Sequence, residues 1–338
     1  MDMRDIAKLA GVSSATVSRV INGSATVRPS TAERVRRVIT QLKFFPNSSA
    51  TTLKRGNSSI YGLIIPDITN PFFPELIRSF ERILVENNRE MLMATTDFHP
   101  SRIQQSIRRM LVRKVDGVAL VASEIETESI ESLIHNRVPL VTMDRRIVGP
   151  GLSDVLINNT SGMNQAIQHL KNLGHEEIGF IGGTVGPTIS DHRTQAFAKA
   201  MKKHNLEYKQ EFIRAGNYRI SGGEVAMTEL LHLSRRPTAI LTANDLTAIG
   251  ALRAIHRHGM VVPRDFSIIG FDDIELSDIL HPPLTTLRLS RQHFAEIFFN
   301  ALEAMRGQSQ VRGRQYTIKT SLIIRESTGP ARKSKKSR

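Results

Sequence analysis

The first 45 residues, which we call the head, carry apolar positions at the spacing of three short amphipathic helices. Asp2, Ser13 and a capping box at 30–33 predict where the helices begin, and Gly11 marks a tight turn between the first two. The predicted inward-facing positions are Ile6, Leu9 and Ala10, then Val17, Val20 and Ile21, then Val35, Val38, Ile39 and Leu42. This pattern predicts a helix-turn-helix.

Residues 59–330, the body, alternate short apolar runs with helix-like segments. The runs are IYGLIIP (60–66), MLMATT (91–96), GVALVA (117–122), IGFIGG (178–183), TAILTA (238–243) and FSIIGF (266–271). Such alternation predicts an α/β fold in which helices cover both faces of parallel sheets. A second series from about residue 160 predicts two lobes. We expect the N-lobe at about 59–159 plus 291–320, and the C-lobe at about 160–290 plus 321–330.

Composition and charge narrow the class of protein. The chain has no cysteine, which excludes disulfides and thiolate metal sites. We find no apolar run of the roughly 18 residues that span a bilayer and no apolar block of a signal peptide, and therefore expect a cytoplasmic protein without membrane contact. Of the net charge of +14, much lies at the two ends: residues 1–58 hold ten Lys/Arg against three Asp/Glu, and residues 331–338 hold five Lys/Arg. A basic head on a near-neutral body is typical of a polyanion-binding module, and we expect the tail 331–338 to be disordered.

The second predicted helix has a polar face opposite its apolar one. The residues projecting from that face are Ser14, Ala15, Ser18, Arg19 and Asn22. Arg19 is suited to a bidentate contact with guanine, while Ala15 and the methyl group of Thr16 are suited to thymine methyl groups. Ser14, Ser18 and Asn22 are suited to phosphates or base edges. We therefore expect this helix to read double-stranded DNA in the major groove.

Residues 46–58 form a separate hinge segment. Pro46 ends the third helix, and Asn47 can cap a short helix at 48–54. Because nucleation makes a two-turn helix marginal by itself, we expect it to be ordered only when bound.

Three motifs lie within residues 5–56: AGVS-x-x-TVSRVIN (10–22), V-x-x-x-T-x-x-x-V (27–35) and F-x-PN-x-x-A-x-x-L (44–53). Together they closely resemble the start of LacI/GalR-family bacterial transcription regulators. The resemblance implies that Ser14, Ala15 and Arg19 read bases of an operator. It also implies that hinge helices of two subunits pair in the minor groove, with Leu53 wedged into a base step and Ala50 at the helix–helix contact.

Polar and aromatic side chains follow the predicted strands of the body. Open parallel sheets bind ligands beyond the carboxyl ends of their strands, so these side chains predict a cleft for a polyhydroxylated molecule. The candidates are Asp67 to Phe73, Thr96-Asp97, Ser123, Asp144-Arg145, Arg193, Tyr218, Asn244-Asp245 and Asp272-Asp273.

The body also carries motifs: NPFF (70–73), PLV-x-x-DR (139–145), GH-x-x-IGFIGG (174–183), R-x-x-AF (193–197), PTAI-x-x-x-ND (237–245) and VP-x-D-x-SIIGFDD (262–273). They resemble the periplasmic-binding-protein-like effector domain of the same family. The resemblance implies an α/β, two-lobed effector domain that also dimerises. By position it implies effector contacts at Phe72, Asp144, Arg193, Tyr218, Asn244 and Asp272. Phe73, Ser123 and Arg145 are further candidates beside them. Each of these residues can instead be a strand-end cap or a structural polar residue.

Enzyme functions find little support in the sequence. Residues 179–186 match neither G-x-G-x-x-G nor G-x-x-x-x-G-K-[ST], and the body has no G-x-S-x-G elbow. His256 and His258, two residues apart on a predicted helix, do not converge on one metal. We therefore expect no catalysis, cofactor or metal.

The sequence is best interpreted as a homodimeric transcription regulator, with repression the expected activity, that binds a pseudo-palindromic operator. A small effector, a sugar, sugar acid or related metabolite, would control operator affinity from the cleft. Two alternatives stay open: a DNA-architectural protein without a working effector site, and a sugar-binding protein. A sugar-binding protein of the transport type would carry a signal peptide and lack a basic head, whereas this sequence shows the reverse.

Overall fold

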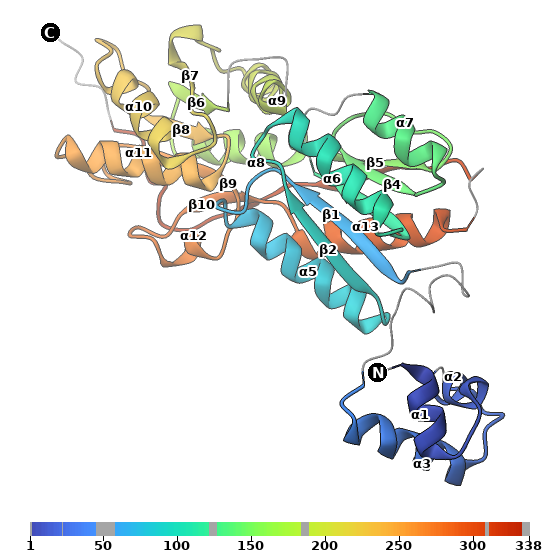
Figure 1. Ribbon diagram of the computed structural model, residues 1–338. Helices are drawn as coiled ribbons and strands as arrows, with labels where there is room; N and C mark the ends of the chain where they lie inside the picture. The colour runs from blue at the N-terminus through green and yellow to red at the C-terminus, as the bar shows by residue number, and fades with distance from the viewer. Residues whose placement is uncertain are drawn as a thin grey trace, which may run out of the picture. The chain divides into compact units, whose positions relative to one another are not determined.

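The computed structural model describes residues 2–21, 23–44, 58–121, 127–183, 189–307 and 311–332 (Figure 1). Contacts divide the chain into two compact units, residues 1–58 and 59–338, which contain the head and the body. No helix in the described ranges is both long and apolar enough to span a membrane.

The head consists of helices α1 (Met3–Ala10), α2 (Ser14–Ile21) and α3 (Pro29–Gln41). The predicted start of α1 is confirmed, because the Asp2 carboxylate accepts hydrogen bonds from the amides of Arg4 and Asp5 in a capping box. At the start of α2, the Ser13 hydroxyl accepts a hydrogen bond from the Thr16 amide at 3.2 Å. The buried core of the head is formed by Ile6, Ala7, Ala10, Val17, Val20, Ala32 and Val35.

Two details predicted for the head are wrong. Leu9 is 62% exposed, because Ala7 rather than Leu9 shares the inward face of α1 with Ile6 and Ala10. The capping box expected at 30–33 does not form, since α3 already begins at Pro29 and its N-cap residue makes no side-chain capping bond. A proline at the first helical position supplies a helical φ angle without needing a partner for its nitrogen.

The N-lobe is built on a six-stranded parallel sheet. Along the sheet the strands are β11 (Gln315–Lys319), β5 (Leu152–Asn158), β4 (Leu140–Met143), β3 (Gly117–Leu120), β1 (Ile60–Ile65) and β2 (Glu90–Thr95). Helices α5 (Phe72–Glu86) and α13 (Arg291–Met305) pack on one face, and α6 (Pro100–Val112) and α7 (Thr127–His135) on the other. In β1, Leu63 and Ile65 belong to the first core and Ile64 to the second, as the alternation of a strand requires.

The C-lobe repeats this design. Its strands lie in the order β7 (Ile213–Ala215), β6 (Ile178–Gly182), β8 (Ala239–Thr242), β9 (Ser267–Asp272), β10 (Thr285–Arg288) and β12 (Ser321–Ile323), with only β12 antiparallel in this described sheet. Helices α8 (Asn159–Asn172) and α9 (Ile189–Lys203) cover one face, and α10 (Ile220–Leu231) and α11 (Asp245–Arg257) the other. The shorter elements are a 3₁₀ turn (Gln210–Phe212) and α12 (Leu276–Ile279).

The chain crosses between the lobes three times, at β5–α8, β10–α13 and β11–β12 (Figure 1). The predicted α/β class, with two lobes of parallel sheet covered on both faces, is confirmed. At the carboxyl end, the Ala331 amide donates to the Leu173 carbonyl at 2.8 Å, and Arg332 pairs with Asp265 at 2.9 Å. The first two residues of the predicted tail therefore lie against the C-lobe, and 333–338 fall outside the described residues.

Candidate functional site

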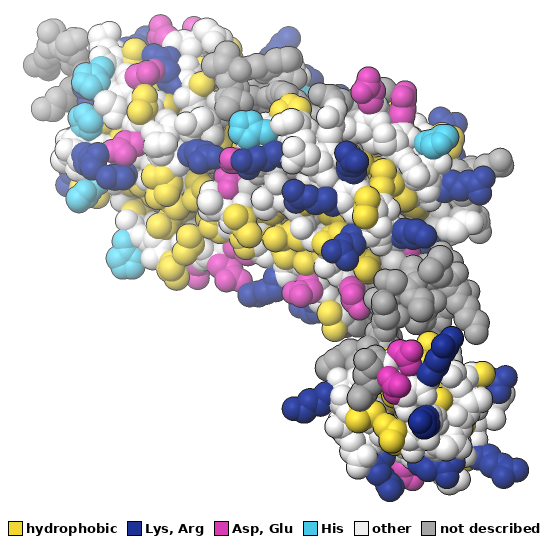
Figure 2. Space-filling view, viewed as in Figure 1, with side chains coloured by type: hydrophobic (Ala, Val, Ile, Leu, Met, Phe, Trp, Pro, Cys, Tyr) yellow, Lys and Arg dark blue, Asp and Glu magenta, His cyan; other side chains and the backbone are white. Residues whose placement is uncertain are grey.

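Helix α2 presents the polar face that its sequence pattern predicts. Val17 and Val20 are buried, while Ala15 and Arg19 are exposed and Ser14, Thr16 and Ser18 are half-buried. Figure 2 shows several Lys and Arg side chains on the surface of the head. Five further positions predicted to bind DNA or effector, Asn22, Asn47, Ala50, Leu53 and Ser123, lie outside the described residues.

The first cluster in the body joins Arg193, on α9, to Asp272, at the end of β9. Arg193 Nη2 lies 3.9 Å from Asp272 Oδ1, and both side chains are buried. The guanidinium carbon of Arg193 lies 3.8 Å from the centre of the Phe271 ring and 5.9 Å from that of Tyr218. Arg193 also donates to the Ala243 carbonyl, while its Nε has no hydrogen-bond partner among the described residues. Three predicted site residues are thus brought together.

The surroundings of Asp272 offset only part of the free-energy cost of burying its carboxylate. Desolvation raises the pKa of its carboxyl from 3.8 to about 8, although nearby Arg193 opposes this shift. Its backbone has φ 115°, a conformation that residues other than glycine seldom adopt. A ligand that donates hydrogen bonds to this carboxyl group would favour its ionised form.

Tyr218 and Asn244 are linked to each other. The Asn244 side-chain amide donates to the Tyr218 carbonyl at 2.9 Å, and its oxygen accepts from the Thr247 amide and hydroxyl at 2.9 and 2.6 Å. Asn244 therefore serves as the N-cap of α11 with its donor and acceptor both engaged. Tyr218 has a left-handed backbone conformation, with φ 59°, and its ring lies 5.9 Å from the guanidinium carbon of Arg193.

Asp144 and Arg145 follow β4. Asp144 is buried; its Oδ1 accepts from the Ile157 amide at 3.2 Å, and its Oδ2 lies 3.6 Å from Nδ1 of His192. The amide of Arg145 donates to Asp154 Oδ1 at 3.2 Å, so a carboxylate that sequence analysis did not select holds this turn. His192, which precedes Arg193 on α9, is another residue that the sequence analysis missed.

Phe72 and Phe73 stand at the start of α5. Phe72 is buried in the N-lobe core, edge-on to Phe73 at 5.4 Å and to Phe294 at 6.5 Å. Phe73 is half-buried against the same core. Of the two, Phe73 is the more accessible aromatic face.

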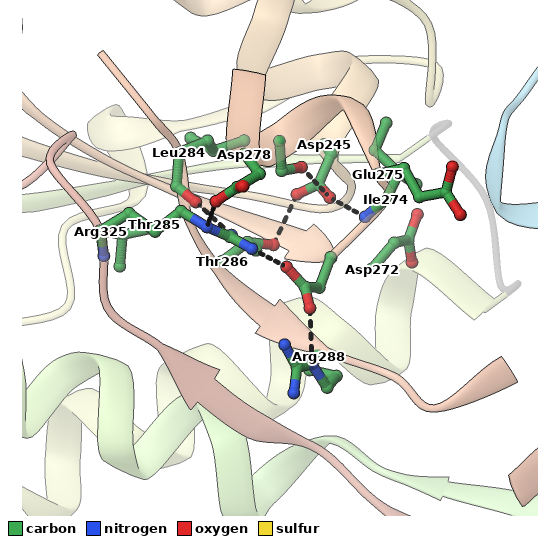
Figure 3. Close-up of polar contacts among 12 residues, drawn as sticks. Asp245, Asp272, Ile274, Glu275, Asp278, Leu284, Thr285, Thr286, Arg288 and Arg325 are labelled. Carbon is green, nitrogen blue, oxygen red and sulfur yellow. Dashed lines mark hydrogen bonds and ion pairs between the residues drawn. The ribbon is translucent and has the colours of Figure 1, made fainter. Parts of the chain in front are cut away.

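Buried hydrogen bonds hold the turn after Asp272 (Figure 3). The Asp245 carboxylate accepts from the Thr286 hydroxyl at 2.6 Å, the Ser277 hydroxyl at 2.8 Å and the Ile274 amide at 2.9 Å. These bonds connect the start of α11, the strand β10 and the turn, and so position Asp272.

Two arginines support the same turn from the other side. Asp273 pairs with Arg288 at 2.6 Å and with Arg325 at 2.8 Å, and Arg325 also pairs with Asp278 at 3.0 Å (Figure 3). The sequence offered no signal for these pairs, because the partners come from segments far apart in the chain.

Arg291 connects the site to the N-lobe. It donates to the carbonyls of Asp272 and Asp273 at 2.6 and 2.7 Å, and pairs with Glu75 on α5 at 2.5 Å. Arg219 makes a further connection between the lobes, 3.6 Å from Asp67. The relative position of the two lobes is thus tied directly to residues of the candidate cleft.

The comparisons with known proteins agree with this arrangement. Residues 2–47 match the model of bacterial regulatory proteins of the lacI family, and residues 167–328 match the periplasmic binding protein-like domain. The chain is 34% identical over 330 residues to the HTH-type transcriptional repressor PurR of Actinobacillus pleuropneumoniae serotype 3, covering 96% of this chain and 97% of that protein. It is 33% identical over 302 residues to the ribose operon repressor of Escherichia coli K12, covering 89% and 91%.

Solved structures show the same fold. The lac repressor dimer bound to operator and an anti-inducer superimposes with a TM-score of 0.85 at 23% identity, covering 97% of this chain and 99% of that chain. An Enterococcus faecium LacI-family regulator with bound ribose gives 0.71 at 26% identity, covering 81% and 100%. The resemblance in the sequence motifs is confirmed: the chain belongs to the LacI family of bacterial regulatory proteins and is a DNA-binding transcriptional repressor rather than an enzyme.

Proposed function

We propose that the protein is a homodimer that represses transcription in the cytoplasm from a pseudo-palindromic operator, with Ser14, Ala15, Thr16, Ser18 and Arg19 of α2 facing the bases. The exposure of Ala15 and Arg19 supports this assignment. Asn22 would belong to the same face, and Asn47, Ala50 and Leu53 would act in the minor groove, as in the family. A single recognition helix reads few base pairs, so a second half-site multiplies specificity.

The proposed dimer is supported by an apolar surface on the body. Figure 2 shows hydrophobic side chains gathered over α12 and α5, and Leu276, Ile279 and Val85 of these helices are exposed. A contiguous apolar surface of this kind is typical of a protein–protein interface. We expect Ile279→Asp to shift the protein from dimer to monomer in sedimentation experiments. Val112→Asp serves as the exposed control, because α6 covers the face of the N-lobe sheet opposite α5. A dimer unaffected by Ile279→Asp would exclude this surface.

The effector proposal rests on one observation: Arg193, Asp272 and Tyr218 converge where the strands of the C-lobe end. A guanidinium and a carboxylate beside an aromatic ring suit a small molecule with vicinal hydroxyls, such as a sugar or sugar acid. Phe72, Phe73, Asp144, Arg145, Asn244 and Ser123 complete the proposed contact set. The bound ribose of the Enterococcus faecium regulator supports this class of ligand.

Thermal-shift screening tests the effector proposal. The purified protein would be screened against sugars, sugar acids, phosphosugars and purines, beside Arg193→Ala and the matched surface variant Arg253→Ala. We expect a compound that stabilises the wild type and Arg253→Ala but not Arg193→Ala. A compound that stabilises all three equally would place the effector elsewhere.

The DNA proposal is tested on an operator selected by the wild-type protein from random duplexes. Losing a bidentate guanine contact costs about 1–3 kcal/mol, or roughly 5- to 150-fold in affinity. We expect Arg19→Ala to lose this affinity together with specificity at one base pair in each half-site. Arg34→Ala, an exposed arginine on α3, should leave base specificity unchanged. Unchanged specificity in Arg19→Ala would refute the assignment.

A further inference from the structure

A second concave site lies where the two lobes meet at the β5–α8 crossing. It encloses about 260 Å³. The N-lobe contributes Arg146 and Thr317, and the C-lobe contributes Asn159 at the start of α8 together with His192 and Lys199 on α9. We call this site the α8–α9 groove. It draws on both lobes, so a molecule bound in it would contact both.

Two cationic side chains of the groove, those of Arg146 and Lys199, are not neutralised within the described part of the chain. Arg146 and Lys199 are exposed, and no described carboxylate lies within 4.0 Å of either charged group. They stand beside the first residues of α8, a 14-residue helix whose amino-terminal end carries a partial positive charge. Cations at such a helix end are typical of a site for an oxyanion.

A buried polar atom independently indicates a ligand. Asn159 lines the groove and is only 5% exposed, yet its side-chain oxygen has no hydrogen-bond partner among the described residues. Leaving a buried acceptor unsatisfied is costly, so such atoms normally have a partner. A bound molecule that donates a hydrogen bond would supply one.

We propose that the α8–α9 groove is a second ligand site, separate from the candidate effector cleft, for a small metabolite bearing a phosphate or carboxylate group. The anion would lie between Arg146 and Lys199 at the start of α8, and a hydroxyl or amine of the same molecule would donate to Asn159. The volume is slightly below the roughly 300 Å³ at which pockets accept drug-sized ligands, which favours a small molecule.

The groove adjoins the candidate effector cleft. His192 lines the groove, lies 3.6 Å from Asp144 and precedes Arg193 on α9. An occupant of the groove would therefore restrain the same helix and the same inter-lobe contact that the effector residues use. This second site does not depend on the identity of the effector or on its binding to Arg193.

Calorimetric titration with inorganic phosphate, and separately with acetate, tests the proposal on the full-length protein, with chloride adjusted to keep the ionic strength constant. We expect saturable binding of at least one anion. Its affinity should fall about tenfold or more in Arg146→Gln and in Lys199→Gln, as expected for loss of a charge-assisted hydrogen bond. Because both side chains are exposed, the circular dichroism spectra of these variants should match that of the wild type.

Two control variants make the test specific. Lys202→Gln removes the same charge from an exposed position of α9 that does not line the groove, and Arg193→Ala alters the effector cleft. Lys202→Gln should retain wild-type anion affinity, and Arg193→Ala should weaken anion binding less than Lys199→Gln does. The proposal is overturned if neither anion binds, if Lys202→Gln weakens binding as much as Lys199→Gln, or if only Arg193→Ala abolishes it.

Discussion

Replacing Asp245 by asparagine should stabilise the protein at neutral pH. The carboxyl group is fully buried and accepts three hydrogen bonds, but no described cation lies within 4.0 Å of it. Desolvation raises its pKa from 3.8 to about 6. Because the folded-state pKa lies above the unfolded one, this group's contribution to stability is complete below about pH 3.8 and is lost as the pH rises to about 6.

The size of the effect follows from this shift. A rise in pKa from 3.8 to about 6 corresponds to about 3 kcal/mol. This is the extra free energy needed to ionise Asp245 in the folded protein compared with the unfolded chain. Asparagine is neutral at every pH, keeps an oxygen for the Ile274 amide and the Ser277 hydroxyl, and turns its NH₂ group toward the Thr286 hydroxyl. We therefore expect Asp245→Asn to raise the free energy of unfolding by up to about 3 kcal/mol at about pH 7.5, and by only about 1.6 kcal/mol at about pH 5.

Urea unfolding followed by circular dichroism at pH values between about 5 and 7.5 measures this difference. Asp265→Asn is the control of opposite sign. Its side-chain hydrogen bond from Arg264 lowers the pKa of Asp265, so the substitution should destabilise the protein at neutral pH. A stability difference between wild type and Asp245→Asn that does not change with pH would refute the reasoning, as would destabilisation by Asp245→Asn at pH 7.5.

Three further predictions follow from contacts in the body. Burial lowers the pKa of His175 below 6.5. The stabilising contribution of the neutral imidazole is therefore complete above about pH 6.5 and is lost as the pH falls. We expect His175→Gln to make the free energy of unfolding, measured by urea titration, less dependent on pH in this range. Arg291→Met breaks the pair with Glu75 and two bonds to carbonyls, and should lower the free energy of unfolding by about 3–5 kcal/mol; a loss below about 1 kcal/mol contradicts this. Gly162→Ala places a methyl group 2.5 Å from the Thr320 hydroxyl, and should cost about 1–3 kcal/mol, measured as a lower Tm.

Sequence periodicity predicted the architecture well because burial follows the period of each element. The alternating runs of the body became parallel strands, and the inward positions of α2 became the buried Val17 and Val20. Leu9 was misplaced because Ala7 shares the inward face, and an alanine gives a weak hydrophobic signal beside a leucine. Pro29 competed with the Ser30 capping box, and the helix began two residues earlier, with Arg28 rather than Ser30 as its N-cap.

The candidate cleft was predictable only in part. Arg193 and Asp272 converge because α9 follows strand β6 and Asp272 ends strand β9 of the same parallel sheet, an arrangement that the order of the segments indicates. Glu75, His192 and Arg291 were missed because their roles depend on how the lobes approach each other, and no local pattern encodes that approach. The sequence also did not indicate that Asn244, a proposed effector contact, caps α11 with its side chain.

The three crossings between the lobes have a consequence for synthesis on the ribosome. Strand β5 ends at Asn158, but its sheet neighbour β11 begins only at Gln315. At translation rates of about 5–20 residues per second, the nascent N-lobe exposes that strand edge for roughly 8–30 s before its partner is made. An unpaired strand edge can form hydrogen bonds with another chain and so cause aggregation. A chaperone that binds extended apolar segments would therefore act mainly during this interval.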